Sequence, residues 1–190
     1  VDGLERRLKD GALVADVGCG TGRALIRLAK AFPNSRFHGY DVASGAVERA
    51  RRAVEEAGVA DRVEIRKLDA GEGLPERYDL ITVFDVIHDA RDPKGVLSSV
   101  RGALRHDGVC MCLEIASEEK LEDNAGPLGA LKYGFSVLYC MTSSLAVGGA
   151  GLGTCGMNEA RLRELSLEAG FSTVKAIAED PFSRIYEIRP

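Results

Sequence analysis

The pattern of apolar and polar positions predicts strands and helices in alternation along most of the chain. Short apolar or alternating runs predict five strands, at residues 12–17, 36–42, 62–68, 78–87 and 108–115. Apolar residues at helical spacing predict four helices, at residues 23–32, 45–57, 93–104 and 159–169. Ser44, Asp92 and Asn158 stand where three of these helices need a capping side chain. Such alternation is typical of a parallel sheet covered by helices on both faces.

The C-terminal end of the chain follows a different pattern. Residues 172–179 and 184–189 predict two more strands, and only a short connection containing Asp180-Pro181 separates them. A connection this short joins antiparallel neighbours. The sequence therefore predicts an α/β fold with a Rossmann-like, doubly wound, seven-stranded sheet that is mostly parallel and ends in an antiparallel hairpin.

One irregular insertion, residues 116–157, separates the fifth strand from the last helix. Its segment 133–153 carries no charged side chain, but serine, threonine and glycine interrupt it. These residues make it a poor candidate for a membrane span. We expect a helix that is buried or covers a ligand, followed by a glycine-rich hinge, so that the insertion acts as a lid.

Composition limits the class of protein. The chain has 190 residues, of which 25 are basic and 29 acidic, and 45% are hydrophobic. These values predict a single globular domain, residues 1–190, without the excess positive charge that favours nucleic acid. The five cysteines form no C-x-x-C pair, and no signal peptide is visible, so we expect a reducing, cytoplasmic setting and no metal site.

The most informative motif is a glycine-rich turn between the first strand and the first helix. Its residues are Asp16, Val17, Gly18, Cys19, Gly20, Thr21 and Gly22, followed by Arg23 where a dinucleotide-binding loop would have glycine. At an effective dielectric constant of about 20, electrostatic repulsion between the Asp16 carboxylate and a pyrophosphate about 6 Å away would cost about 3 kcal/mol per charge pair. The turn therefore disfavours NAD and a nucleotide-dependent oxidoreductase. It favours a ligand with an ammonium and a sulfonium group.

This turn resembles motif I of the class I S-adenosylmethionine-dependent methyltransferases, and further matches follow along the chain. The resemblance implies that Asp41, with Val42, holds the ribose hydroxyls, since a carboxylate accepts from two neighbouring hydroxyls. It implies that Asp69 and Ala70 contact the adenine, and that Phe84, Asp85 and Val86 hold the methionine end. Asp69 is also a common turn former before Gly71, and Asp85 is a possible helix cap.

A narrower resemblance is to a subgroup of these enzymes that carries an additional winged-helix-like domain at the N-terminus. This narrower resemblance rests on the stretches 84–89 and 133–154. It implies that such a domain is missing here and that residues 125–153 pack against that domain or against a second copy of the chain. Two residues depart from the pattern of that subgroup: Glu114 at the end of the fifth strand and Gly156 after the glycine-rich loop. Both departures affect the expected acceptor pocket.

Two side chains are candidates for contact with a methyl acceptor. His88 lies beside Asp89 just after the fourth strand, and a His–Asp pair can act as a general base. Tyr133 lies in the insertion. For both, simple packing is the alternative. The sequence predicts methyl transfer from S-adenosylmethionine to a small molecule. A non-catalytic binding or assembly module, and methylation of nucleic acid or protein, are the alternatives.

Overall fold

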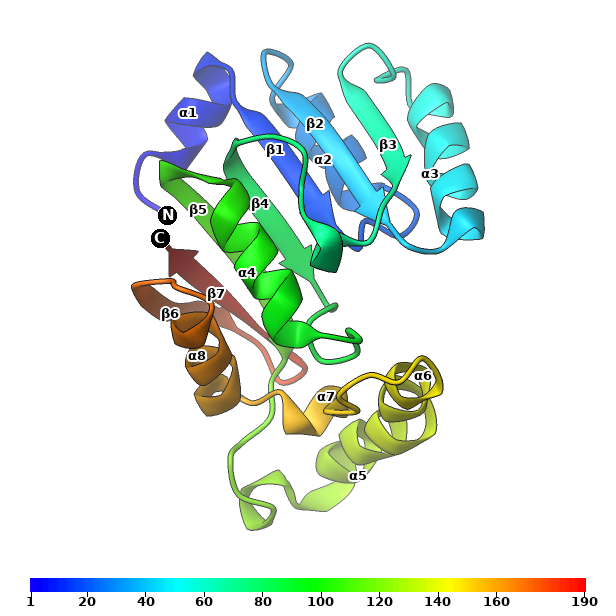
Figure 1. The fold of residues 1–190 in the computed structure, drawn as a ribbon, viewed down its shortest axis with the longest axis vertical. Helices are drawn as coiled ribbons and strands as arrows, with labels where there is room; N and C mark the ends of the chain where they lie inside the picture. The colour runs from blue at the N-terminus through cyan, green and yellow to red at the C-terminus, as the bar shows by residue number, and fades with distance from the viewer.

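The computed structural model describes residues 1–190 and contains the predicted sheet. Seven strands are hydrogen-bonded in the order β3-β2-β1-β4-β5-β7-β6 (Figure 1). Their bounds are β1 Leu13–Val17, β2 Arg36–Asp41, β3 Val63–Lys67, β4 Tyr78–Phe84, β5 Leu104–Ile115, β6 Thr173–Glu179 and β7 Ser183–Arg189. All neighbouring pairs are parallel except β5–β7 and β6–β7, which are antiparallel. The predicted fold class and the C-terminal hairpin are therefore confirmed.

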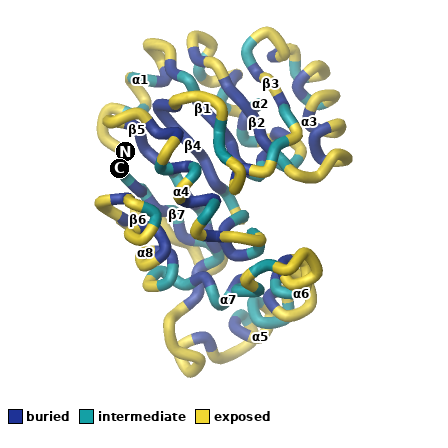
Figure 2. The backbone as a smooth tube through the Cα atoms, in the orientation of Figure 1, coloured by how far each residue is buried: buried dark blue, intermediate teal, exposed yellow.

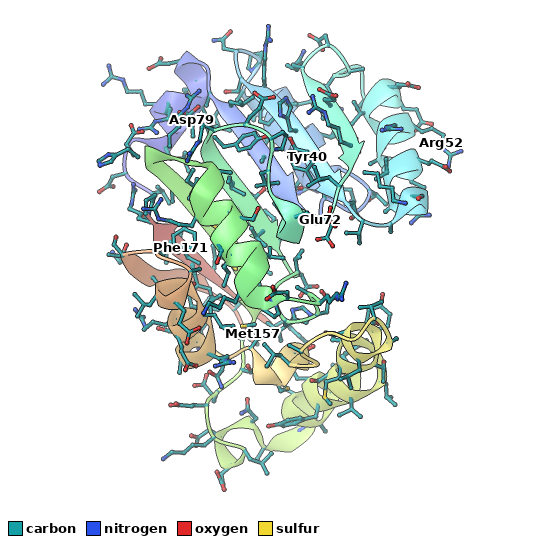
Figure 3. All side chains as sticks on the ribbon, viewed as in Figure 1. Tyr40, Arg52, Glu72, Asp79, Met157 and Phe171 are labelled. Carbon is teal, nitrogen blue, oxygen red and sulfur yellow. The ribbon has the colours of Figure 1, made fainter.

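Helices cover both faces of the sheet, and each face has its own core. The helices are α1 Leu4–Asp10, α2 Arg23–Ala31, α3 Ser44–Glu56, α4 Pro93–Ala103 and α8 Glu159–Glu168. Apolar residues of α4 and α8 pack on one face, and those of α1, α2 and α3 pack on the other. Figure 2 shows the central strands β1, β2 and β4 mainly buried, whereas the outer helix surfaces and the edge strand β6 are largely exposed. Two buried tyrosines bond to each other on the α4 face, with 2.6 Å between the hydroxyl oxygens of Tyr40 (labelled in Figure 3) and Tyr78.

Several boundaries differ from the predicted ones for local reasons. The fourth strand ends at Phe84 instead of residue 87, because Asp85 has a φ of 63° and turns the chain out of the sheet. The fifth strand begins at Leu104, four residues earlier than expected. Ser44 is not a cap but the first residue of α3, and the Asp41 side chain accepts from the Ala43 N–H there instead. Asp92 and Asn158 cap α4 and α8 as predicted.

The insertion folds into a small helical cap. It contains the 3-10 turn η2 Glu122–Asn124, the helix α5 Gly126–Phe135, the π-helical turn η3 Ser136–Cys140, and the helices α6 Met141–Ala146 and α7 Gly153–Gly156. The cap lies beyond the carboxyl ends of β4 and β5 (Figure 1). Met157, labelled in Figure 3, directly follows α7 and is buried in the α4-face core, so it anchors the returning chain.

The cap keeps part of its apolar surface exposed. Gly148, Gly151 and Gly153 have φ values of 71°, 61° and 65°, which explains the glycines in its loop. Leu138 is 81% exposed, Tyr139 65%, and Phe135 and Val147 59% each. None of the helices reaches the length and apolarity that a bilayer crossing would require.

Candidate active site

The glycine-rich turn lies where the order of the strands reverses, between β1 and its neighbours β2 and β4. This switch point is where open α/β sheets bind ligands. The backbone N–H groups of Gly18 and Cys19 both donate to the Tyr40 carbonyl, at 2.8 and 3.0 Å. Gly18 has a φ of 68°, and a Cβ atom there would lie 2.3 Å from Val86 Cγ2. Glycine is therefore required at this position by both conformation and space.

The remaining residues of the turn have different surroundings. Gly20 and Gly22 also have positive φ values, of 55° and 75°. Thr21 is exposed, whereas Cys19 is buried with its sulfur facing Gly39 of β2. The Cys19 side chain therefore faces the sheet, and its backbone N–H and C=O bind the Tyr40 carbonyl and the Gly22 N–H.

Asp16 is a buried carboxylate at the end of β1. Its side chain accepts a 2.6 Å hydrogen bond from the Thr82 hydroxyl of β4, and the residue is only 3% exposed. Burial raises the pKa of Asp16 to about 7, against the opposing effect of the Thr82 hydrogen bond. A cation bound nearby would stabilise the ionised form, so this position is suited to an ammonium or sulfonium ligand.

Asp41 connects the glycine-rich turn to the start of α3. One carboxylate oxygen accepts from the Gly20 N–H and the other from the Ala43 N–H, both at 2.9 Å. Each oxygen keeps a second lone pair for a ligand hydroxyl. Val42 beside it is 59% exposed. The structure thus brings Asp41 and the glycine-rich turn together.

The adenine-side candidates lie at the next strand end. Asp69 accepts from the Gly71 N–H at 2.9 Å and caps the short 3-10 helix η1, Ala70–Glu72. This is the turn-forming role named as the alternative for Asp69, and it leaves the second carboxylate oxygen without a partner. Ala70 is buried in the α4-face core.

Phe84, Asp85 and Val86 leave β4 opposite the glycine-rich turn. Val86 packs against Gly18, and the Asp85 N–H donates to the Leu113 carbonyl of β5. Asp85 is the one non-glycine residue with positive φ. Strained backbone of this kind clusters at functional sites. Its position therefore supports a role in ligand contact.

His88 has a carboxylate partner that the sequence does not reveal. Its Nδ1 lies 2.6 Å from Glu114 Oε2, and the two side chains are 3% and 1% exposed. The expected partner, Asp89, makes no such contact, and Asp85 Oδ1 lies 3.8 Å away. The other Glu114 oxygen accepts from the Ile87 N–H at 2.8 Å. The His88–Asp89 pair is therefore wrong, and the pair is His88–Glu114.

The protonation of His88 follows from this pair. Desolvation lowers its pKa, but the hydrogen bond and charge of Glu114, with the charges of Asp85 and Asp89, outweigh it and raise the pKa to about 10. Nδ1 is occupied, and Nε2 has no hydrogen-bond partner in the chain. His88 therefore presents a single free nitrogen.

Asp85, His88 and Glu114 place three possible metal-ligand atoms within 4.8 Å of one another. The 2.6 Å separation between His88 and Glu114 is shorter than the roughly 3 Å expected between neighbouring ligands that each lie about 2.1 Å from an ion. The geometry is that of a shared proton. The sequence missed the cluster because Glu114 is 26 residues from His88.

A cavity of about 350 Å³ lies between the cap and the ends of β4 and β5. Its walls are mostly apolar and its floor is polar. It is lined by Asp85, His88, Asp89, Ile115, Leu131, Lys132, Phe135, Tyr139, Cys140, Thr154 and Phe182. Tyr133 is not among these residues, so the structure places Tyr139 and not Tyr133 at the cavity. The π-helical turn η3 separates these two tyrosines.

A second, open groove of about 630 Å³ lies beside α8 and is lined mainly by charged residues. Arg184 there pairs with Glu118, Glu159 and Glu179. Because these side chains bind one another in ion pairs, they are not available as catalytic groups.

The fold and the site define the class of protein. A seven-stranded sheet with β7 antiparallel, a glycine-rich turn after β1 and acids at the ends of β1 and β2 form the architecture of class I S-adenosylmethionine-dependent methyltransferases. The chain belongs to the methyltransferase domain family, whose model matches residues 15–110.

Individual relatives match part of the chain. It is 32% identical over 105 residues to the polyketide synthase ThaQ of Burkholderia thailandensis, covering 55% of this chain and 5% of ThaQ. It is 32% identical over 110 residues to the malonyl-[acyl-carrier protein] O-methyltransferase of Acetivibrio thermocellus, covering 57% of this chain and 38% of that protein. The chain thus spans less than half the length of either relative.

Solved structures share the fold over nearly the whole chain. The mitomycin 7-O-methyltransferase MmcR has a TM-score of 0.69 and 24% identity, covering 96% of this chain and 50% of its own. The O-methyltransferase NcsB1 from neocarzinostatin biosynthesis, solved with S-adenosyl-L-homocysteine and 1,4-dihydroxy-2-naphthoic acid, has a TM-score of 0.70 and 23% identity. That match covers 93% of this chain and 48% of NcsB1.

Proposed function

We propose that this domain transfers a methyl group from S-adenosylmethionine to a small-molecule acceptor bound in the cavity beneath the cap. One observation carries the proposal. The glycine-rich turn with Asp16 and Asp41, and the cavity containing His88, meet at the same edge of the sheet. S-adenosylmethionine supplies a methyl group on a sulfonium that is already activated for transfer. The task left to the protein is to position the donor and the acceptor in line.

The residues divide this task between two neighbouring regions. The close approach that the glycine-rich turn allows, with Asp41, Val42, Asp69 and Ala70, would hold the nucleoside. The buried Asp16 carboxylate would face the positively charged methionine end, whereas Asp85, which the resemblance assigns to that end, lines the cavity beneath the cap and serves the acceptor in this proposal. The acids and the lack of a basic residue in the turn fit a cationic cofactor.

His88 supplies proton transfer in this proposal. Glu114 binds Nδ1 and fixes the orientation of the ring, so Nε2 is left for the acceptor. An acceptor hydroxyl, amine or acidic carbon loses a proton as it takes up the methyl group, and Nε2 receives that proton once it has lost its own. Glu114 then stabilises the imidazolium.

Calorimetric titration of the chain with S-adenosylmethionine, S-adenosylhomocysteine and NAD tests the cofactor. We expect micromolar binding of the two sulfur ligands and none of NAD. Asp41→Ala removes the acceptor for the Gly20 and Ala43 N–H groups as well as the ribose contact, so affinity should fall at least about tenfold, or ~1.4 kcal/mol. Asp61→Ala, which removes an exposed carboxylate paired with Arg62, should bind normally. Equal binding to Asp41→Ala, or competition by NAD, would contradict the proposal.

We also propose that the exposed apolar face of the cap packs against a second copy of the chain. The face is uncharged over residues 133–153, and an apolar patch of this kind is complementary to itself in a two-fold dimer. Part of the cavity wall is also exposed, because Phe135, Tyr139 and Phe182 line it and are each more than half exposed. An additional N-terminal domain on this face, and a lid function of residues 116–157, stay predictions.

The substitution Leu138→Glu tests this interface. Leu138 is 81% exposed, so its replacement should leave the fold intact, while a charge buried between two apolar faces should shift a dimer to monomer. Light scattering after gel filtration at several concentrations measures the change, with Leu167→Glu on α8, 51% exposed, as the control. A wild-type chain that stays monomeric at high micromolar concentration would rule the dimer out.

The cellular setting also stays a proposal. All five cysteines are free, and four of them are buried. This supports the predicted reducing, cytoplasmic compartment.

A further inference from the structure

Two carboxylates on the floor of the acceptor cavity have no hydrogen-bond partner in another residue of the chain. They belong to Asp85 and Asp89, both in the loop that follows β4. Asp85 Oδ1 comes no closer than 3.8 Å to His88 Nδ1, which Glu114 already occupies. Carboxylates that face an apolar cavity favour a ligand that offers a donor or a positive charge.

A buried side chain at the same floor independently indicates a ligand. His88 is 97% buried at its side chain, yet its Nε2 has no partner in the chain although the residue lines the cavity. A ligand that donates to the two carboxylates and presents an acceptor atom to the Nε2–H group would satisfy all three. The floor is therefore a polar site built under an apolar roof.

The cations near the cavity compensate these charges only in part. His88 faces three carboxylates at once, because its Nδ1 lies 2.6 Å from Glu114 and 3.8 Å from Asp85, and Asp89 also contributes to its raised pKa. Lys132 also lines the cavity, but its ammonium group donates to the Ala116 carbonyl. It contributes to the lowered pKa values of Glu179 and Asp180, so its charge acts on a different group of acids. The floor therefore keeps an excess of negative charge.

The roof of the cavity suits an apolar molecule. Leu131, Phe135 and Tyr139 come from the cap, while Phe182 and Ile115 complete the wall. Aromatic faces also attract an adjacent cation. A volume of about 350 Å³ is in the range of small-ligand pockets.

From these observations we propose that the acceptor pocket takes an aromatic molecule that carries a protonated amine, with the amine on Asp85 and Asp89 and the ring under Phe135 and Tyr139. Aromatic carboxylates are disfavoured there, which would distinguish this chain from NcsB1, solved with a naphthoic acid. The inference rests on the proposed function, because it assigns the substrate class of that same site.

A charge series on one ring system tests the inference without knowledge of the natural acceptor. The chain, saturated with S-adenosylhomocysteine, is titrated with 2-naphthylmethylamine, 2-naphthylmethanol and 2-naphthoate. We expect the amine to bind at least about tenfold more tightly than the carboxylate, with the alcohol between them. In Asp89→Asn and in Asp85→Asn the preference should fall severalfold. Asparagine tolerates the positive φ of Asp85, so that variant keeps the local backbone.

Two controls separate the possible failures. Glu55→Gln, an exposed change on α3, should keep the wild-type preference. Binding of S-adenosylhomocysteine to each variant shows that the fold and the cofactor site are intact. An absent charge preference, tighter binding of the carboxylate, or no saturable binding of any probe overturns the substrate class while leaving the proposed function standing. Loss of S-adenosylhomocysteine binding by the wild-type chain instead overturns the proposed function itself.

Discussion

Gly18→Ala is expected to destabilise the chain by about 2–5 kcal/mol and to weaken cofactor binding by more than tenfold. The new methyl group would lie 2.3 Å from Val86 Cγ2, and the backbone at residue 18 has a φ of 68°. A left-handed conformation costs an L-residue about 1–2 kcal/mol, and overpacking adds about 1–3 kcal/mol. The loop can relieve the clash only by moving away from the Tyr40 carbonyl, which holds the N–H groups of Gly18 and Cys19.

Gly58→Ala is a matched control for this change. Gly58 has the same φ of 68°, but a Cβ atom there meets nothing within 4 Å. Gly58→Ala should therefore lower the free energy of unfolding only by the cost of the left-handed backbone, about 1–2 kcal/mol. This corresponds to about 2–8 °C in melting temperature for a domain of this size. Chemical denaturation of both variants measures the difference. The double change Gly18→Ala with Val86→Ala removes the clashing methyl groups and should recover part of the lost affinity for S-adenosylhomocysteine. If Gly18→Ala is no more destabilising than Gly58→Ala, the close packing against Val86 has no energetic consequence.

The grouping of the candidate cofactor-binding residues was predictable because they are close in sequence to the ends of strands. Asp16, Gly18 and Gly20 lie in one short turn, and Asp41 ends the next strand. Parallel strands place these ends side by side, so a correct strand assignment is enough to assemble them. The same reasoning explains why the seven-stranded sheet was predicted with only small shifts at its boundaries.

The acceptor half was not predictable in the same way. Glu114 is far from His88 in sequence, and only the parallel pairing of β4 with β5 brings the two together. The sequence alone therefore pairs His88 with its neighbour Asp89. Tyr139 lines the cavity instead of Tyr133, and the segment between them contains a π-helical turn that no simple periodicity indicates. Long-range pairing and irregular helix geometry thus determine the part of the candidate site that we propose for the acceptor.

Glu114→Gln is expected to change both the proton position on His88 and the pH dependence of stability. In the wild-type chain the Nδ1 proton is held by a carboxylate that also accepts from the Ile87 N–H. The glutamine amide can still accept from Ile87, but its NH₂ group then faces Nδ1. The neutral ring must accept there and carry its proton on Nε2. Nitrogen NMR of the imidazole should show this change, and methyl transfer that needs a base should slow by about 10²–10⁴-fold.

The accompanying stability effect has a defined sign and window. The pKa of His88 is raised from 6.5 to about 10 in the folded chain, so the stabilisation is complete below about pH 6.5 and is lost as the pH rises toward 10. Asp16, with a pKa of about 7, has largely titrated by pH 7.5, and unfolded cysteines ionise mainly above pH 8.5. Between pH 7.5 and 8.5 the wild-type chain should therefore lose about 1 kcal/mol more stability than Glu114→Gln.

Denaturant unfolding of both proteins across this window measures the difference, with Glu119→Gln, an exposed change in the cap, as the control. Parallel pH profiles for wild type and Glu114→Gln would mean that His88 does not carry the extra proton. A slower methyl transfer in Glu114→Gln with parallel profiles would assign Glu114 to positioning of the ring alone. Because the two readouts depend on different properties of the same pair, they separate the charge of His88 from its orientation.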